Sequence, residues 1–545
     1  MYHKPSLDER TSGVLLHPTS LPGEGGSGDV GKQAYHFADF LAASGQSWWQ
    51  MLPIGPVDGS GSPYNSYSAF AGSDLLISLE DLCAQKLLSR ADLEAVKLPQ
   101  GIVKRSVKRV FYDKVGARRR ELLGIAFERF QKNLNRNQKL SKQYSAFCRE
   151  EAHWLEDYVL FCALKDVHDQ EPWWTWEREL VTRRAKALAE AKEAYAERIA
   201  YHTFIQFVFH EQWMKLKVYC NKKGVGLIGD IPIFVAHDSS DVWAHTDLFD
   251  LDKDRLPREV SGAAPDAFSD EGQLWGHPLY KWGKHKKTGY AWWIDRFRQT
   301  FKIFDAVRID HFLGFARYWS VQYSAKTARH GKWKKGPGED LFVALRDAIG
   351  EMPIIAEDLG ILTPQAARLR DQFGFPGMRV LQFAYGEDDS YHAAHQHSKQ
   401  CVVYTGTHDN DTTKGWWKEI CRKHRADKKA MKLKSEKIAK RRRVSVSSLN
   451  GEAKWLTEKE RTLVCLGGGG EEIHWDMIRA GMGSRANLAV FPAQDLLGLD
   501  EKSRMNVPGT IENNWCWRLE SGALDQEVAH RLGELTKIHG RSSGS

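Results

Sequence analysis

Short apolar runs alternate with segments of helical periodicity along much of this chain, and this alternation predicts its secondary structure. The apolar runs predict eight β-strands, at 13–17, 47–54, 225–235, 304–310, 353–357, 378–384, 401–407 and 486–491. Helical periodicity predicts helices between the later strands, at 292–303, 338–349, 364–373 and 471–482. Alternating strands and helices imply a parallel sheet with right-handed crossovers. We therefore predict an α/β fold, a (β/α)8 TIM barrel with large, mostly helical and loop insertions.

Three long segments interrupt this pattern. Residues 57–200 are mostly charged and helical, apart from a Gly/Ser/Tyr loop at 59–72, whereas residues 239–290 look loop-rich. Residues 412–470 hold a run of basic residues. A barrel needs about 250 residues, so a chain of 545 residues leaves ample length for such additions. We predict one catalytic barrel domain over residues 1–545, with insertions at about 57–200, 239–290 and 412–470.

Three of the predicted strands end at acidic residues: Asp310, Glu357 and Asp409. A parallel barrel gathers the carboxyl ends of its strands at one mouth, which is where its active site lies. Two facing carboxyl groups are the minimum machinery for cleaving a glycosidic bond. Any one acid could instead cap a helix or pair with a cation. Three acids at strand ends together favour catalysis.

The residues around these acids indicate different roles for them. Arg308 and Asp310 are two apart on a strand and share a face, so the arginine is expected to keep Asp310 ionised as a nucleophile. Glu357 follows the apolar Ile-Ile-Ala, and partial burial there would raise its pKa, as a general acid requires. Asp409 follows His408 and is expected to stabilise a cationic transition state or to bind substrate hydroxyls.

The net charge of +8 is concentrated in one segment. Residues 422–443 contain twelve Lys/Arg and two acids, a net +10, which leaves about −2 for the rest of the chain. We interpret this segment as a solvated helix or mobile insertion, with a patch for a polyanion or partner protein as the alternative. No nucleic-acid-binding motif accompanies it, so no nucleic-acid partner is expected.

Other features set the cellular context. The eight cysteines form no Cys-x-x-Cys pair, no apolar run reaches 18 residues, and the first residues lack an apolar signal core. We expect a cytoplasmic protein without membrane spans, disulfides or a zinc site. Three histidines at 392, 395 and 397 are interpreted as part of a polar loop, and no cofactor or metal is expected. Twenty tryptophans are many for this length, and by default we interpret most of them as core residues; a surplus beyond core needs would suit packing against sugar rings.

Several stretches of this sequence are similar to one known family. The chain resembles 4-α-glucanotransferases of the amylomaltase or disproportionating-enzyme type, glycoside hydrolase family 77. Each stretch alone is modest evidence, but their order together is specific. Besides the three acidic motifs, the matching stretches are 13–22, 62–72, 229–238, 265–269, 272–275, 506–510 and 514–515.

The resemblance implies that Asp310 is the nucleophile, Glu357 the acid/base and Asp409 the stabiliser. Two positions depart from the family pattern: Leu313 stands where the family has Arg, and Ala264 where it has Pro. The resemblance also implies a set of residues that line the sugar sites, namely Tyr64, Asp238, Asp266, Gln273, Trp275, Arg308, His311, His408 and Asn410.

The expected reaction is the transfer of α-1,4-glucan segments from one malto-oligosaccharide or amylose chain to an acceptor sugar by retaining double displacement. Two alternatives remain open from the residues alone. One is an α-amylase-like hydrolase with the same acids, and the other, more distant, is a non-catalytic glucan-binding protein. The sequence does not determine the oligomeric state.

Overall fold

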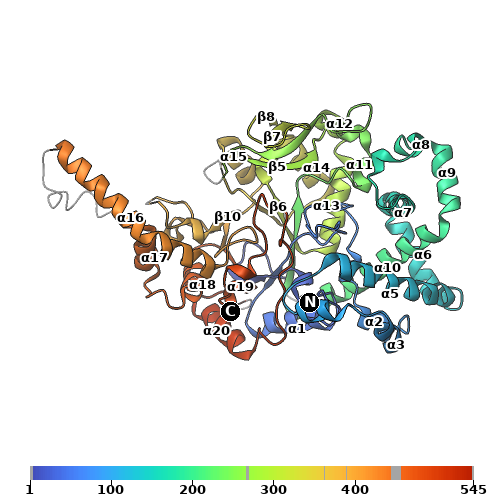
Figure 1. The fold of residues 1–545 in the computed structure, drawn as a ribbon, viewed down its shortest axis with the longest axis horizontal. Coiled ribbons are helices and arrows are strands. Elements are labelled where there is room, and N and C mark those ends of the chain that lie inside the picture. The colour runs from blue at the N-terminus through green and yellow to red at the C-terminus, as the bar shows by residue number, and fades with distance from the viewer. Residues whose placement is uncertain (1–3, 266–268, 361, 388, 443–455, 543–545) are drawn as a thin grey trace.

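A closed barrel of eight parallel strands forms the centre of the molecule (Figure 1). The computed structural model describes residues 4–265, 269–360, 362–387, 389–442 and 456–542. Neighbouring strands follow the order β1-β12-β11-β10-β9-β6-β3-β2, and β1 closes the ring by pairing with both β12 and β2. The barrel strands are β1 (Thr11–Leu15), β2 (Trp48–Gln50), β3 (Gly226–Pro232), β6 (Ala306–Asp310), β9 (Ile354–Ala356), β10 (Gly377–Val380), β11 (Cys401–Tyr404) and β12 (Leu488–Pro492).

The predicted fold class and all eight predicted barrel strands are therefore confirmed. Two predicted strands are clearly shorter in the structure: 47–54 is reduced to β2, and of 378–384 β10 includes only the part up to Val380. A 3-10 turn over Leu381–Phe383 follows directly, and the Ala384 N–H closes it by donating to the Leu381 carbonyl at 2.9 Å.

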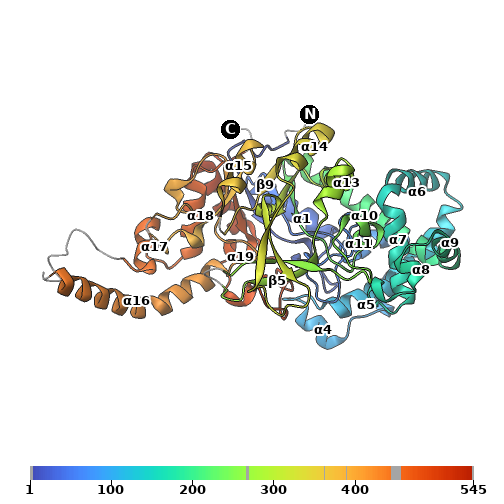
Figure 2. The ribbon, with the colours of Figure 1, turned by 90° about the horizontal axis from the view of Figure 1, so that it is seen from above.

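Helices surround the barrel and fill the long connections between its strands (Figures 1 and 2). The helices between β2 and β3 are α2 (Leu79–Ala84), α3 (Arg90–Ala95), α4 (Gln100–Arg105), α5 (Tyr112–Leu134), α6 (Gln138–Glu150), α7 (Ala152–Val167), α8 (Arg178–Val181), α9 (Ala185–Ala194) and α10 (Ala196–Lys222). The others are α1 (Lys32–Ala43), α11 (Ser240–Ala244), α12 (Trp282–Lys287), α13 (Ala291–Ile303), α14 (Glu339–Ile349), α15 (Pro364–Gln372), α16 (Thr413–Arg442), α17 (Glu458–Leu466), α18 (Ile473–Gly483), α19 (Ala493–Leu496) and α20 (Gln526–Ile538).

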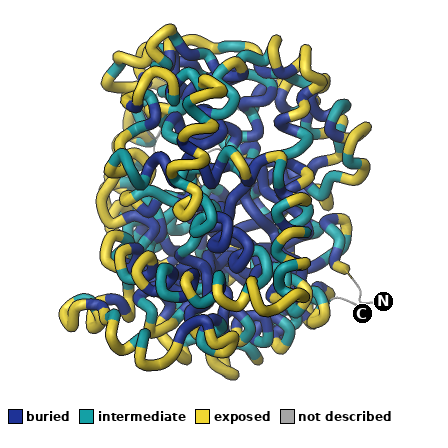
Figure 3. The backbone as a smooth tube through the Cα atoms, turned by 90° about the vertical axis from the view of Figure 1, so that its right-hand side faces the viewer, coloured by how far each residue is buried: buried dark blue, intermediate teal, exposed yellow. Residues whose placement is uncertain are grey.

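Apolar side chains of strands and covering helices form one continuous core, which occupies the middle of the molecule (Figure 3). Several of the tryptophans are part of it: Trp48, Trp49 and Trp293 are almost completely buried. The default interpretation of these tryptophans as core residues is confirmed. No helix in the described part of the chain is long and apolar enough to cross a membrane.

A second, antiparallel sheet was not predicted. Its strands follow the order β5-β4-β7-β8 and are β4 (Glu259–Ala263), β5 (Gln273–Pro278), β7 (Arg317–Gln322) and β8 (Gly331–Lys335). The interpretation of residues 239–290 as loop-rich missed β4 and β5. Their runs are short, and glycines at 262, 272 and 276 interrupt the alternation that marks a strand.

One arginine near the end of the chain ties the first and last barrel strands together. The fully buried Arg541 donates hydrogen bonds to the carbonyl oxygens of Thr11 at 2.8 Å and Asn487 at 2.9 Å. It also donates to Met482 and Ala486, each at 2.8 Å. Burial lowers the pKa of Arg541 to about 9. The guanidinium thus satisfies carbonyl groups on both sides of the β1–β12 junction.

We expect Arg541→Ala to lower the free energy of unfolding by about 3 kcal/mol, because several buried carbonyl groups lose their donors. Arg541→Lys keeps the charge but not the five-donor fork, so it should recover only part of the loss. Urea denaturation followed by tryptophan fluorescence measures both variants. Unfolding of Arg541→Ala at the wild-type midpoint would show that Arg541 does not stabilise the closed barrel.

Candidate active site

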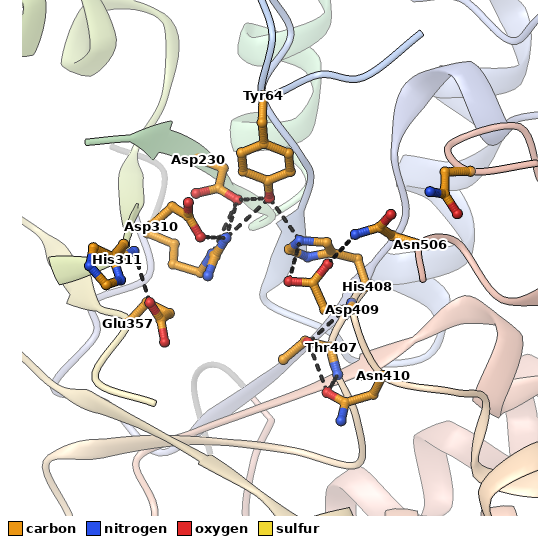
Figure 4. Close-up of polar contacts among 12 residues, drawn as sticks. Tyr64, Asp230, Asp310, His311, Glu357, Thr407, His408, Asp409, Asn410 and Asn506 are labelled. Carbon is orange, nitrogen blue, oxygen red and sulfur yellow. Dashed lines mark hydrogen bonds and ion pairs between the residues drawn. The ribbon is translucent and has the colours of Figure 1, made fainter. Parts of the chain in front are cut away.

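The three predicted acids lie at the carboxyl ends of barrel strands (Figure 4). Asp310 is the last residue of β6, and Glu357 directly follows β9. Asp409 lies in the loop after β11. Since parallel strands end at the same mouth of a barrel, residues far apart in sequence meet there.

A buried arginine occupies the middle of this cluster. Arg308 Nη2 lies 3.0 Å from Asp310 Oδ1, so the two side chains share a face of β6 as predicted. The same guanidinium donates two hydrogen bonds to Asp230 Oδ2, at 2.7 Å from Nη2 and 3.1 Å from Nε. Burial disfavours the Arg308 cation, but Asp230, Tyr64 and Asp310 outweigh it and hold the pKa of Arg308 well above its ordinary value.

Glu357 is bound by backbone groups on both carboxyl oxygens. Its Oε2 accepts the His311 N–H at 2.8 Å, and its Oε1 accepts the Leu359 N–H at 2.9 Å. Burial and, secondarily, the charge of Asp310 raise the pKa of Glu357 to about 8, although Arg308 and the Leu359 N–H oppose the shift. Glu357 is therefore mostly protonated at neutral pH, which agrees with the effect of burial expected from the sequence.

Tyr64 links the arginine to the third acid. Its hydroxyl donates to Asp230 Oδ2 at 2.7 Å and accepts from Arg308 Nη2 at 3.1 Å. His408 Nε2 lies 2.9 Å from the same hydroxyl oxygen and 3.4 Å from Asp409 Oδ2. Because the hydroxyl donates its only hydrogen to Asp230, it can only accept from His408, whose ring hydrogen must therefore be on Nε2. Burial lowers the pKa of His408, so the ring is neutral.

Asp409 is held by a loop near the end of the chain. Asn506 Nδ2 donates to Asp409 Oδ1 at 2.6 Å, and Arg504 Nη2 donates to the Asp409 backbone carbonyl at 2.6 Å. Arg504 also donates to the backbone carbonyl of Asn506 at 2.7 Å, which joins the two contacts. The side chains of Asp409 and Asp310 remain 45% and 30% exposed, so both can meet a substrate.

The predicted sugar-site residues fall into two groups. Close to the acids, Trp275 packs edge-on against His311 with ring centroids 4.8 Å apart, and Gln273 accepts the Trp275 indole N–H at 3.2 Å. Asn410 lies in the same loop as Asp409, where its Oδ1 accepts the Thr407 N–H at 2.9 Å. A pocket lined by His408 and Asn410 opens beside them.

Asp238 is not among the contacts of this cluster. Asp238 forms an ion pair with the buried Lys165 at 2.6 Å and accepts the Trp173 N–H at 3.3 Å. Asp266 lies outside the described residues. The histidines at 392 and 397 have backbone partners: Val380 N–H donates to His392 Nδ1 at 3.1 Å, and His397 Nε2 donates to the His392 carbonyl at 2.9 Å.

Reasoning from the sequence missed two residues of the cluster, Asp230 and Asn506. Asp230 is on β3, far from Arg308 in the sequence. Burial raises the pKa of Asp230 to about 7, although Arg308 opposes the shift. A carboxylate on an apolar strand was a signal in the sequence, since Asp230 interrupts an otherwise apolar run. Asn506 begins one of the stretches that carry the resemblance, but its partner was not predictable.

A parallel barrel whose mouth holds one protonated and two exposed acids defines the class of enzymes that act on glycosidic bonds. The family model described as 4-alpha-glucanotransferase matches residues 16–524, and the chain belongs to that family, glycoside hydrolase family 77. The 4-alpha-glucanotransferase of Thermus thermophilus is 43% identical over 97% of this chain and 98% of its own length. That of Synechocystis is 40% identical over 98% of this chain and 99% of its own length.

A solved structure agrees with the sequence comparison. The amylomaltase from Streptococcus agalactiae in complex with acarbose is 34% identical, with a TM-score of 0.87, and the match covers 98% of this chain and 100% of that one. The resemblance inferred from motifs is therefore confirmed over nearly the whole chain.

We expect kcat/KM on maltotriose to fall as pH rises through about 8, because Glu357 then loses the proton that a leaving sugar needs. A donor such as α-maltosyl fluoride, whose fluoride leaves without protonation, should show a flatter basic limb. Glu357→Gln should lose about 10²–10⁴ in rate on maltotriose and much less on the fluoride. Equal losses on the two donors would assign the proton to another group.

We expect Asn506→Ala to lower kcat about 10- to 100-fold with little change in KM, because Asp409 loses the donor that fixes its orientation. Thr510→Ala is the matched control, since its hydroxyl bonds only within the same loop, to Val507 and Asn514. Steady-state kinetics on maltotriose compares the two. An equal loss in Thr510→Ala would point to loop stability and not to Asp409.

Proposed function

We propose that this protein transfers α-1,4-glucan segments from a malto-oligosaccharide or amylose chain to an acceptor sugar by retaining double displacement. The observation that carries the mechanism is the contact between Glu357 and the backbone N–H of His311. His311 directly follows Asp310, so this contact holds a mostly protonated carboxyl beside the arginine-bound one. Membership of the 4-alpha-glucanotransferase family supports the same reaction.

In the first step, Asp310 Oδ attacks the anomeric carbon while Glu357 gives its proton to the departing glycosidic oxygen. The C–O bond to the leaving sugar breaks, and an ester between the glucan and Asp310 forms. In the second step, Glu357 takes the proton of an acceptor 4-hydroxyl, whose oxygen displaces Asp310. Two inversions retain the α configuration. This mechanism requires the two carboxyl groups to be about 5–5.5 Å apart.

Arg308 and Asp409 support these steps electrostatically. Arg308 orients Asp310 for attack and also disperses the negative charge that returns to Asp310 when the ester breaks. Asp409, oriented by Asn506, faces the developing positive charge of the sugar ring. Transfer outcompetes hydrolysis when the site holds an acceptor sugar better than water, and we assign Trp275 to acceptor or donor packing.

We place the reaction in the cytoplasm. All eight cysteines are free thiols, as in a reducing compartment. We also propose that the reaction needs no metal ion, because the charges required by both steps are supplied by Arg308, Glu357 and Asp409.

Incubation with maltotriose followed by chromatography of the products tests the reaction. We expect glucose together with a ladder of longer malto-oligosaccharides, because only transfer can lengthen a chain. Products that are exclusively shorter than maltotriose would establish a hydrolase instead. Unchanged maltotriose, with binding detected by calorimetry, would establish a glucan-binding protein.

A further inference from the structure

Helix α16 carries most of the charge excess and extends away from the rest of the molecule (Figures 1 and 2). Its first turns are fixed at the barrel: Asp495 accepts the Thr413 N–H at 2.8 Å, and Lys418 pairs with Glu501 at 2.7 Å. The part from residue 422 onward is the projecting half of the helix. We call residues 422–442 the basic arm.

The basic arm presents a stripe of cations on one side. At 100° per residue, Arg422, Arg425, Lys429, Lys432 and Lys440 lie within about 80° of one another. All five are exposed. The stripe from residue 422 to 440 is about 27 Å long, at 1.5 Å per residue.

The opposite side of the arm is less exposed. The half-buried residues His424, Asp427, Met431, Ser435 and Ile438 recur at intervals of three and four residues. His424 Nδ1, for example, lies 2.9 Å from the Thr457 hydroxyl. The arm therefore has one half-buried side and one exposed side, and the cationic stripe is on the exposed side.

Most cations of the stripe are not neutralised by the protein. Arg422 pairs with Glu419 at 2.7 Å, but Arg425, Lys429, Lys432 and Lys440 form no ion pair with any residue that the structure describes. Glu436 is the single acid within the stripe. Such a row of unpaired like charges repels itself, so it is stabilised by an external anion.

The composition of the arm selects among polyanions. Its outward side lacks the aromatic residues that stack on unpaired bases or anchor protein interfaces. Leu433, half exposed, is the one large apolar side chain exposed on the described part of the arm, so the arm has no apolar face to enter a lipid surface. Lysine, its commonest cation, is depleted in protein–protein interfaces.

The shape of the arm favours a duplex. Lys437 and Arg441 extend the positive charge to one flank of the stripe. A projecting α-helix fits the major groove of B-form DNA, where phosphates line both walls. We propose that the basic arm binds the phosphate backbone of double-stranded DNA without reading its sequence. This proposal departs from the expectation, drawn from the absence of a motif, that there is no nucleic-acid partner.

Binding of the intact protein to a fluorescein-labelled 24-base-pair DNA duplex, followed by fluorescence anisotropy across a salt series, tests this proposal. The affinity should fall steeply with salt, since each phosphate contact contributes about −0.9 to the slope of log K against log salt. An arm variant should bind at least about 10-fold more weakly at 0.1 M salt. The slope of log K against log salt should also become less negative by about 3. That variant combines Arg425→Gln, Lys429→Gln, Lys432→Gln and Lys437→Gln.

A matched variant removes four equally exposed lysines elsewhere and should bind DNA like the wild type. It combines Lys97→Gln, Lys139→Gln, Lys222→Gln and Lys253→Gln. Both variants should keep wild-type activity on maltotriose, which shows that they are folded. The proposal is overturned if the wild type does not bind at 0.1 M salt, or if the two variants lose affinity equally.

Two further probes test the choice of partner. A 24-base-pair RNA duplex should bind more weakly, because the major groove of A-form RNA is too narrow for a helix. Vesicles with 30% phosphatidylserine should bind more weakly than DNA. Equal or tighter arm-dependent binding to either probe would replace the proposed DNA groove with a different partner.

Discussion

The buried cation of Arg308 is the charge on which the geometry of the site depends. Its guanidinium contacts Asp230, Asp310 and the hydroxyl of Tyr64, which come from three distant parts of the chain. Without it, two carboxyl groups would face each other with no counter-charge in a desolvated position. Because Asp230 is almost completely buried and Asp310 is not, the two carboxylates bound to Arg308 have different roles. Asp230 fixes the arginine, and the arginine fixes the reactive acid.

A continuous chain of contacts runs from this cation to the far side of the site. Tyr64 connects Arg308 to His408, which lies against Asp409, and Asp409 is bound in turn by Asn506. The second half of the cluster is thus oriented relative to the first through a single hydroxyl group. The acid that must carry a proton, Glu357, is outside this chain and is held by backbone N–H groups instead. Its pKa is therefore set mainly by burial, and the opposing charges of Asp310 and Arg308 have smaller effects.

The barrel was predictable because each strand is a compact apolar run and the three acids are at strand ends. The antiparallel sheet was not, because strands such as β5 alternate weakly and contain glycine. Within the site, the shared face of Arg308 and Asp310 followed from the two-residue period of a strand. The partnership of Asp409 with Asn506 did not follow from any local pattern, since it joins residues 97 positions apart through loops. Family resemblance supplied the names of loop residues such as Trp275, for which periodicity offers no signal.

The contacts of Arg541 across the β1–β12 junction can form only after the end of the chain has been synthesised. The hydrogen bond from Arg541 to Thr11 spans 530 residues, and the partner strand of β1, β12, is also synthesised last. At 5–20 residues per second, roughly half a minute to two minutes separate the emergence of the two ends from the ribosome. During that time β1 has an edge without its final neighbour, and such an edge is open to pairing with other chains. The nascent barrel therefore needs protection, by chaperones or by its own helical insertions, until translation is complete.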